Sequence, residues 1–390
     1  MTQPRVKLKS TDDNSKYGYP KRVIEIRTGK GDFQTPTRAI TNHEYYQKVA
    51  SATDITFDGK TSIFFDRFTL KKLKAFLTED KPFENLSKRL KVQTERSQHS
   101  YLNLALLKPS STKDDKKNSA VELLQSSKRI REKYIRMIIQ LQRALSLDPV
   151  VVPIMPLPED DTKEMMREIK GYLDSQNVSV IFFFDLNRKL PALLNYAIKD
   201  LQLPIIGLNY KRYTSAVQSY EAIREYSNDD VAFVMANTTR ADALNENIST
   251  MHYLPFLSND IFSSFVPPPV MTEEPQTYQD ALSGIKLFSK KQLILEKMLE
   301  KQIDINQIMS EVERPNDHKI REMLTNYNKG TTSDKTLAIT RLRAFSKVHE
   351  AKSSLDEFVS LRKHIEERST KDYVDSTDKK FLKKTLDKIK

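Results

Sequence analysis

The chain has 390 residues, with 64 Lys and Arg against 52 Asp and Glu, a formal net charge of +12 and no cysteine. The absence of cysteine excludes disulfides, iron–sulfur clusters, thiolate zinc sites and a cysteine nucleophile. The basic surplus favours an anionic partner, and the partner we expect is nucleic acid, either DNA or tRNA. No stretch reaches the roughly 18 to 20 apolar residues of a membrane helix, and the amino-terminal residues lack the apolar core of a signal peptide. We therefore expect a cytoplasmic protein that does not bind membranes.

The first predicted element is a β-hairpin over residues 22–40. Residues 22–27 read RVIEIR and alternate in polarity, TGKGD supplies a turn with two glycines, and residues 33–40 read FQTPTRAI. A strand, a glycine-containing turn and a second strand are typical of a hairpin. Pro36 places the second arm at a sheet edge or at the start of a strand.

Short apolar runs then recur along the chain. Several are nearly continuous, which is typical of strands covered on both faces of a parallel sheet. The predicted strands are 55–57, 62–65, 102–107, 150–155, 178–184, 204–208, 231–235, 251–256 and 285–288, with helical patterns at 163–173, 190–201 and 216–226. This alternation predicts an α/β fold, a (β/α)8 TIM-like barrel over residues 1–290 with a polar insertion near 108–119. Residues 291–390 are predicted to be a helical, basic region packed on the barrel, including a long amphipathic helix at 341–367.

Several common catalytic signatures are missing from the sequence. There is no G-x-G-x-x-G, no G-x-x-x-x-G-K-[ST], no H-E-x-x-H and no G-x-S-x-G. A dinucleotide site, a phosphate loop, a zinc protease site and a serine hydrolase elbow are therefore poor candidates. We predict no metal site and no cofactor.

Polar residues follow five of the predicted strands. In a (β/α) barrel the carboxyl ends of the strands converge on one mouth, which holds the active site. Asp185, Asn209 and Asn237 are the candidates for binding a base there, and Arg240 and Lys290 are candidates for binding phosphate. Each also has a structural alternative, since a residue such as Asp185 could simply cap the next helix. An unrelated barrel enzyme acting on a small phosphorylated substrate is an open alternative.

Four stretches, in order along the chain, resemble the tRNA-guanine transglycosylase superfamily, which includes the 7-deazaguanine transglycosylases that modify DNA. They read GDFQTPTRAI, VIFFFDL, ALSGIKLFSKK and HEAKSSLDEFVSLRKHI. The resemblance implies that Asp185 recognises the target base, and that His349 and Arg362 belong to the family's carboxyl-terminal helix. It also implies a function: exchange of guanine for a 7-deazaguanine base in DNA or tRNA.

The sequence departs from this family at the reaction centre. Ser289 stands where the family has its nucleophilic aspartate, and the zinc-site cysteines are missing. Base exchange needs a carboxylate that attacks the sugar C1′, so Asp260 or Asp280 is the candidate nucleophile if catalysis is retained, and Asp66 is a candidate general base. The alternative is a non-catalytic member that binds nucleic acid or supports a partner subunit, as a homo- or heterodimer.

Two basic segments are candidates for a nucleic-acid surface. Segment 67–98 has nine Lys and Arg against four acids, while its three phenylalanines, at near-helical spacing, are better explained as core. The second segment is the tail 379–390. Its candidate contacts are Lys379, Lys380, Lys383 and Lys384.

Overall fold

Eight parallel strands form one sheet, and its two edge strands are in contact, so that the sheet is a nearly closed barrel. The structure is a computed structural model that describes residues 3–13, 21–51, 55–114, 118–186, 189–210, 223–238, 248, 250–264, 285–289, 292–297, 325 and 331–389. The strands are β4 (Thr37–Thr41), β5 (Thr61–Phe68), β6 (Leu102–Pro109), β9 (Val150–Pro153), β10 (Val180–Asp185), β11 (Ile205–Asn209), β12 (Ala232–Thr238) and β13 (Ile261–Ser264). They follow one another around the barrel in chain order, which confirms the predicted (β/α)8 fold.

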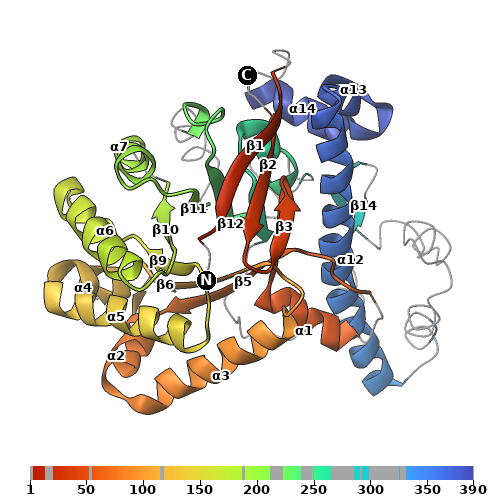
Figure 1. The fold of residues 1–390 in the computed structure, drawn as a ribbon. Helices are drawn as coiled ribbons and strands as arrows, with labels where there is room; N and C mark the ends of the chain where they lie inside the picture. Colours follow the sequence, from red (N-terminus) through yellow and green to blue (C-terminus); the bar gives the residue numbers. More distant parts are fainter. Residues whose placement is uncertain are drawn as a thin grey trace.

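Helices cover the outside of the barrel (Figure 1). They are α1 (Asn42–Ser51), α2 (Leu70–Thr78), α3 (Asp80–Arg96), α4 (Ala120–Ser126), α5 (Lys128–Ala144), α6 (Glu159–Asp174) and α7 (Leu190–Asn195), which continues into a π-turn. Local sequence fixes where some of them begin. Ser119 and Glu122 form a capping box at the start of α4, which satisfies backbone N–H groups that a helix end leaves free.

A three-stranded antiparallel sheet closes the amino-terminal end of the barrel. Its strands are β1 (Arg5–Asp12), β2 (Lys21–Thr28) and β3 (Gly31–Gln34). Ile24, Ile26 and Phe33 of this sheet pack with the inward-facing residues of the barrel strands. The predicted hairpin is confirmed in β2 and β3, and the barrel begins with β4 after a cis peptide bond between Thr35 and Pro36.

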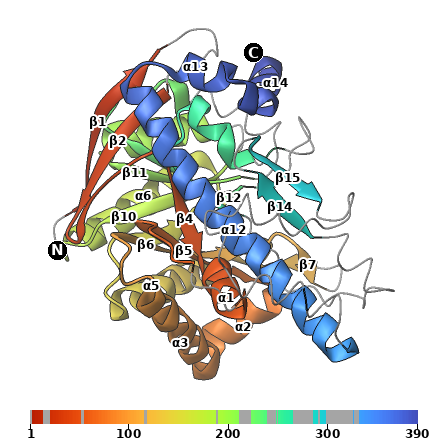
Figure 2. The same ribbon diagram turned by 90° about the vertical axis from the view of Figure 1, so that its right-hand side faces the viewer.

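The carboxyl-terminal region packs along one side of the barrel. The long helix α12 (Thr332–Glu366) contacts α1, β4 and both β1 and β2, and Figure 2 shows it running diagonally across the molecule. It is followed by α13 (Thr370–Asp375) and α14 (Lys380–Ile389). A separate hairpin of β14 (Lys286–Ser289) and β15 (Ile294–Lys297) packs against α12. The predicted helix at 341–367 is confirmed and begins earlier than expected.

Three strand predictions were wrong. Residues 251–256 form 3₁₀ turns instead of a strand, residues 55–57 are irregular, and residues 285–288 belong to the β14–β15 hairpin and not to the barrel. The eighth barrel strand is β13, which the sequence analysis missed. The predicted helix at 216–226 lies outside the described residues except for 223–226. Among the helices of the described ranges, none has the length and apolar character required to cross a membrane.

Candidate functional site

The carboxyl ends of the eight strands lie at one end of the barrel, and strand alternation decides which side chains face its interior. Ile181 and Phe183 of β10 pack inside the barrel, whereas Phe182 and Phe184 pack outside, beneath the helices. Asp185 has the parity of Phe183, so its side chain points into the mouth. The structure therefore puts this predicted base-binding residue where the barrel rule requires it.

Two cations share the mouth with Asp185. Lys108 of β6 and Arg67 of β5 each follow an inward-facing apolar residue by two positions, and they are partners in the β5–β6 register. Lys108 forms an ion pair with Asp185. Because β9 lies between β6 and β10, this pair reaches across the end of β9 on one side of the mouth. Lys108 was predicted to lie in the polar insertion, but it belongs to strand β6.

Solvent reaches this ion pair. The side chains of Lys108 and Asp185 are 21% and 16% exposed, so a ligand can approach both. Burial lowers the pKa of Arg67 from its ordinary value. The ordinary pKa of an arginine is so far above neutral pH that the side chain stays protonated. The three side chains together carry one net positive charge, which attracts an anionic ligand.

Two amides extend the polar ring. Asn209 is paired with Asp185 in the β10–β11 register, and its Oδ1 accepts a hydrogen bond from Asn237 Nδ2 at 3.4 Å. Asn237 has a φ of 63°, and the β12–β13 register shifts between Met235 and Thr238. A bulge of this kind re-aims a side chain at a strand end, and asparagine adopts positive φ more readily than most residues. The three predicted base-binding residues are thus brought together at one end of the barrel.

A cavity of about 360 Å³ lies beside Asp185. Met155, Leu157 and Leu193 supply apolar wall, and Lys189 is the second charged group that lines it. Its volume falls within the range of about 300–1,000 Å³ typical of small-molecule sites, which pair apolar walls with a few polar groups. Phe184 and Thr162 also line the cavity, so it extends from the end of β10 towards the covering helices α6 and α7, with Asp185 in its wall.

Asp260 lies at the other end of the barrel. It immediately precedes β13, and its carbonyl accepts a hydrogen bond from the first residue of β4, Thr37 N, at 2.9 Å. Its carboxylate is buried and accepts bonds from Arg22 Nε at 3.1 Å, Arg22 Nη2 at 2.6 Å and Phe233 N at 2.7 Å. Because residues 251–256 are not a strand, Asp260 begins a strand instead of following one. Its position suits a structural ion pair and not attack on a sugar at the mouth.

Ser289 ends a strand that is not part of the barrel. In the β14–β15 hairpin it is buried, and the neighbouring Phe288 carbonyl lies 3.1 Å from His349 Nε2 of α12. Ser346 also donates to the carbonyl of Lys286. The hairpin is therefore fastened to α12, and Ser289 does not occupy one of the eight strand ends.

The other candidates divide between two groups. Arg240, Asp280 and Lys290 lie outside the described residues. Asp66 has outward parity on β5, and its carboxylate accepts bonds from Lys72 at 2.5 Å and Arg89 at 3.0 Å on the covering helices. The strand itself separates Asp66 from the mouth.

The two predicted basic segments differ in how many of their Lys and Arg side chains are exposed. In segment 67–98, Phe68 and Phe76 are buried in contact with each other and Phe83 stacks on Phe76, as expected. The Lys and Arg of α2 and α3 are largely exposed. In the tail, Lys379 is buried against Glu357 at 2.7 Å. Lys383 pairs with Asp375 at 2.9 Å, whereas Lys380 and Lys384 are exposed. Lys379 is thus a core cation rather than a surface contact.

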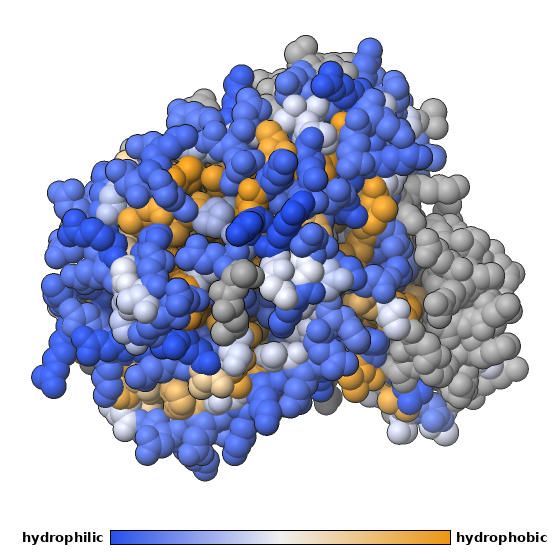
Figure 3. All heavy atoms as spheres, viewed as in Figure 1, coloured by the Kyte–Doolittle hydropathy of each residue, from blue (hydrophilic) through white to orange (hydrophobic). Residues whose placement is uncertain are grey.

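A further basic helix was missed. α5 carries six Lys and Arg against one Glu, whereas its neighbour along the chain, α6, carries six acids against three Lys and Arg. The signal was present in the run KRIREK at residues 128–133. Figure 3 shows that this side of the molecule is largely hydrophilic, with small apolar spots.

Among the described residues, no group of three or more His, Asp or Glu side chains could hold a metal ion. No protein-family model matches the sequence, and no curated protein matches it.

Proposed function

We propose that the barrel mouth binds a nucleobase of DNA or tRNA, and that the protein is a divergent transglycosylase-like enzyme that exchanges guanine for a 7-deazaguanine base. The observation that carries this proposal is Asp185, a carboxylate that faces the mouth beside an apolar cavity of about 360 Å³. The two oxygens of a carboxylate match the two adjacent N–H donors on the edge of a guanine-like base. Arg67 and Lys108 would face the phosphates on either side of that base.

Contacts among the segments that resemble the family also support the proposal. Arg362 Nη1 of α12 donates to the carbonyl of Pro36, at the first barrel strand, at 2.6 Å. His349, from the same helix, contacts Phe288 of the third segment. Three stretches that lie far apart in the sequence thus meet along one helix, as expected if they descend together from one ancestral fold.

The distribution of charge outside the mouth favours a polyanion. The basic helices α2, α3 and α5 cover neighbouring parts of the barrel wall, whereas α6 is acidic. Phosphate contacts from Lys and Arg supply most of the affinity of nucleic-acid complexes. Few large apolar side chains are exposed on these helices, with Val92 the one on α3, so insertion into a lipid surface is disfavoured.

Base exchange with matched carboxylate variants tests the proposal. Labelled guanine and a 7-deazaguanine base would be offered with tRNA or duplex DNA to the wild type, Asp185→Asn and Asp66→Asn. Both aspartates lie near the carboxyl end of a barrel strand, β10 for Asp185 and β5 for Asp66, but only Asp185 faces the mouth. We expect Asp185→Asn to lower incorporation and base affinity by roughly tenfold or more, because a charge-assisted bond is lost, and Asp66→Asn to retain both. Equal behaviour of the two variants would refute the assignment of Asp185.

A second candidate is a member without catalysis that binds nucleic acid through the same mouth. The placement of Asp260 and Ser289 away from the strand ends of the mouth favours it, because Asp185 is then the one described candidate carboxylate at that end. It predicts salt-dependent binding of DNA or RNA, weakened by Asp185→Asn, with no incorporation of any base. Binding that does not change between 50 and 200 mM salt, roughly the range over which phosphate contacts weaken, would argue against it.

A further inference from the structure

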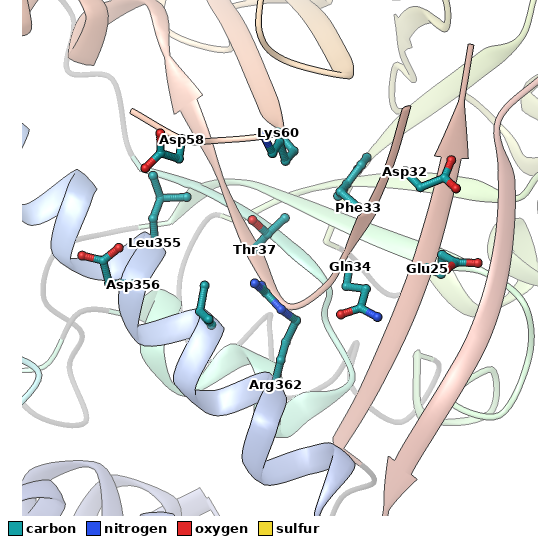
Figure 4. A pocket seen from close by; sticks show the side chains of 11 residues that line it. Glu25, Asp32, Phe33, Gln34, Thr37, Asp58, Lys60, Leu355, Asp356 and Arg362 are labelled. Carbon is teal, nitrogen blue, oxygen red and sulfur yellow. The ribbon is translucent and has the colours of Figure 1, made fainter. Parts of the chain in front are cut away.

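A second cavity, of about 520 Å³, lies at the amino-terminal end of the barrel, opposite the mouth. Three parts of the fold line it. Gln34 belongs to the amino-terminal sheet, Thr37 and Lys60 stand at the starts of β4 and β5, and Asp356 and Arg362 come from α12 (Figure 4). The α12 residues that line it are spaced so that they share one face of the helix.

Four carboxylates line this cavity, and each already has a cation partner. The pairs are Glu25 with Lys9 and Arg27, Asp32 with Arg27, and Asp58 and Asp356 with Lys352. Their N···O distances run from 2.7 to 3.7 Å. Three cations outside the cavity therefore offset most, but not all, of the negative charge of these four carboxylates.

The two cations in the cavity wall are not balanced in this way. Within the described part of the chain, neither Lys60 nor Arg362 has a carboxylate within 4.0 Å. Lys60 Nζ lies over the ring of Tyr101, 5.0 Å from its centroid, and the hydrogen bond of Arg362 goes to the carbonyl of Pro36. A guanidinium has five N–H donors, so most of those on Arg362 are available to a ligand.

Figure 4 shows the guanidinium of Arg362 pointing towards Thr37, with Lys60 on the far side of Thr37 in that view. The cavity thus presents two cations around a hydroxyl, with the amide of Gln34 nearby. Burial lowers the pKa of Arg362, and the charge of Glu366 offsets this only in part. Such a charge gains more from an incoming anion than an exposed one does.

We propose that this cavity is a binding site for a small molecule with one oxyanion group, a phosphate or a carboxylate, held between Arg362 and Lys60. Arginine binds either group through two parallel hydrogen bonds, and Thr37 and Gln34 offer neutral donors and acceptors to the rest of the molecule. The surrounding carboxylates repel a long polyanion, so the site selects a small ligand and not nucleic acid. The bound molecule would join α12 to the starts of β4 and β5 and so stabilise the folded protein.

Titration with inorganic phosphate and with acetate, at constant ionic strength, tests this site in the full-length protein. The variants are Arg362→Gln and Lys60→Gln, and the matched control is Lys163→Gln, which loses the same charge from an ion pair on α6. We expect saturable binding and a rise in Tm in the wild type and the control. Both site variants should bind roughly tenfold more weakly or worse, because each loses a charge-assisted contact. The better of the two anions identifies the group that the natural ligand carries.

A further variant separates this site from the mouth. The phosphate binding that Arg362→Gln and Lys60→Gln remove should persist in Lys108→Gln, because Lys108 lies at the other end of the barrel. Binding that is lost in Lys108→Gln and kept in Arg362→Gln would overturn the proposal, as would the absence of saturable binding of either anion. If Arg362→Gln loosens α12, Lys60→Gln carries the test alone, since the Lys60 ammonium group contacts the ring of Tyr101 and not α12.

Discussion

Replacing Asp260 by Asn should destabilise the fold severely without affecting the mouth. Arg22 uses all five of its N–H donors: two reach the Asp260 carboxylate, and the others reach the carbonyls of Tyr226, Ser227 and Val231. Both side chains of the ion pair are at most 1% exposed. Asp260→Asn keeps the shape of the site but leaves a guanidinium buried without its counter-charge.

Breaking a buried ion pair by removing one partner costs about 3–5 kcal/mol. The entropy of unfolding is roughly 2.1 cal/mol/K per residue, or about 0.8 kcal/mol/K for 390 residues. The expected fall in Tm is therefore about 4–6 °C. Urea and thermal denaturation would measure it, with Asp66→Asn as a control that breaks only partly exposed pairs and should cost about 1 kcal/mol or less.

Two results would refute this reasoning. The first is a free energy of unfolding for Asp260→Asn that stays close to that of Asp66→Asn. The second is a loss of base exchange in Asp260→Asn at a temperature where the variant is fully folded, because that would return Asp260 to the reaction centre.

Two further predictions concern a histidine and a pair of glycines. Burial, with Arg38 and Lys379 nearby, lowers the pKa of His252 well below its ordinary value. The unfolded chain therefore binds a proton at this histidine more readily than the folded chain does. The free energy of unfolding should fall as the pH drops below about 6.5, by at most about 1.4 kcal/mol per pH unit. In denaturation curves at pH 7.5 and 5.5, His252→Phe should reduce the difference in free energy of unfolding between the two pH values, whereas replacing an exposed histidine should not. An equal pH dependence in His252→Phe and the wild type would contradict the prediction. Gly207→Ala should cost roughly 1–3 kcal/mol, because its Cβ would lie 2.2 Å from the ring of Phe183 inside the barrel, while Gly171→Ala, with nothing within 4 Å, should stabilise α6 by about 0.5–1 kcal/mol. Urea denaturation of both variants would check the opposite signs.

The sequence was most informative where local pattern and burial agree. The run ending at Phe184 is continuous and apolar, so both the strand and the inward direction of Asp185 follow from alternation and the barrel rule. Pattern and burial also agree in the long helix at 341–367, since Leu355, Phe358 and Leu361 recur at helical spacing and are buried.

The errors arose where burial occurs without regular structure. Residues 251–256 are apolar because their 3₁₀ turns are packed into the core, and composition alone does not distinguish a buried turn from a buried strand. The true eighth strand, β13, reads IFSS and is too short and too polar to stand out. Because β13 and not 251–256 is the strand, Asp260 lies before a strand, at the end of the barrel opposite the predicted mouth. Lys108 was missed because β6 extends past its last apolar residue.

The contact between Asp12 and Thr370 bears on how the protein is made. The Asp12 carboxylate, at the end of β1, accepts bonds from the backbone N of Thr370 at 3.1 Å and from its hydroxyl, across 358 positions of sequence. Translation at roughly 5–20 residues per second needs about 18–70 s to cover that span. During this interval β1 can already pair with β2, but its end lacks the contact with Thr370. A nascent chain of this protein therefore spends tens of seconds with its amino-terminal sheet made and the carboxyl-terminal contact of that sheet absent, an interval in which chaperones that bind incomplete domains can act.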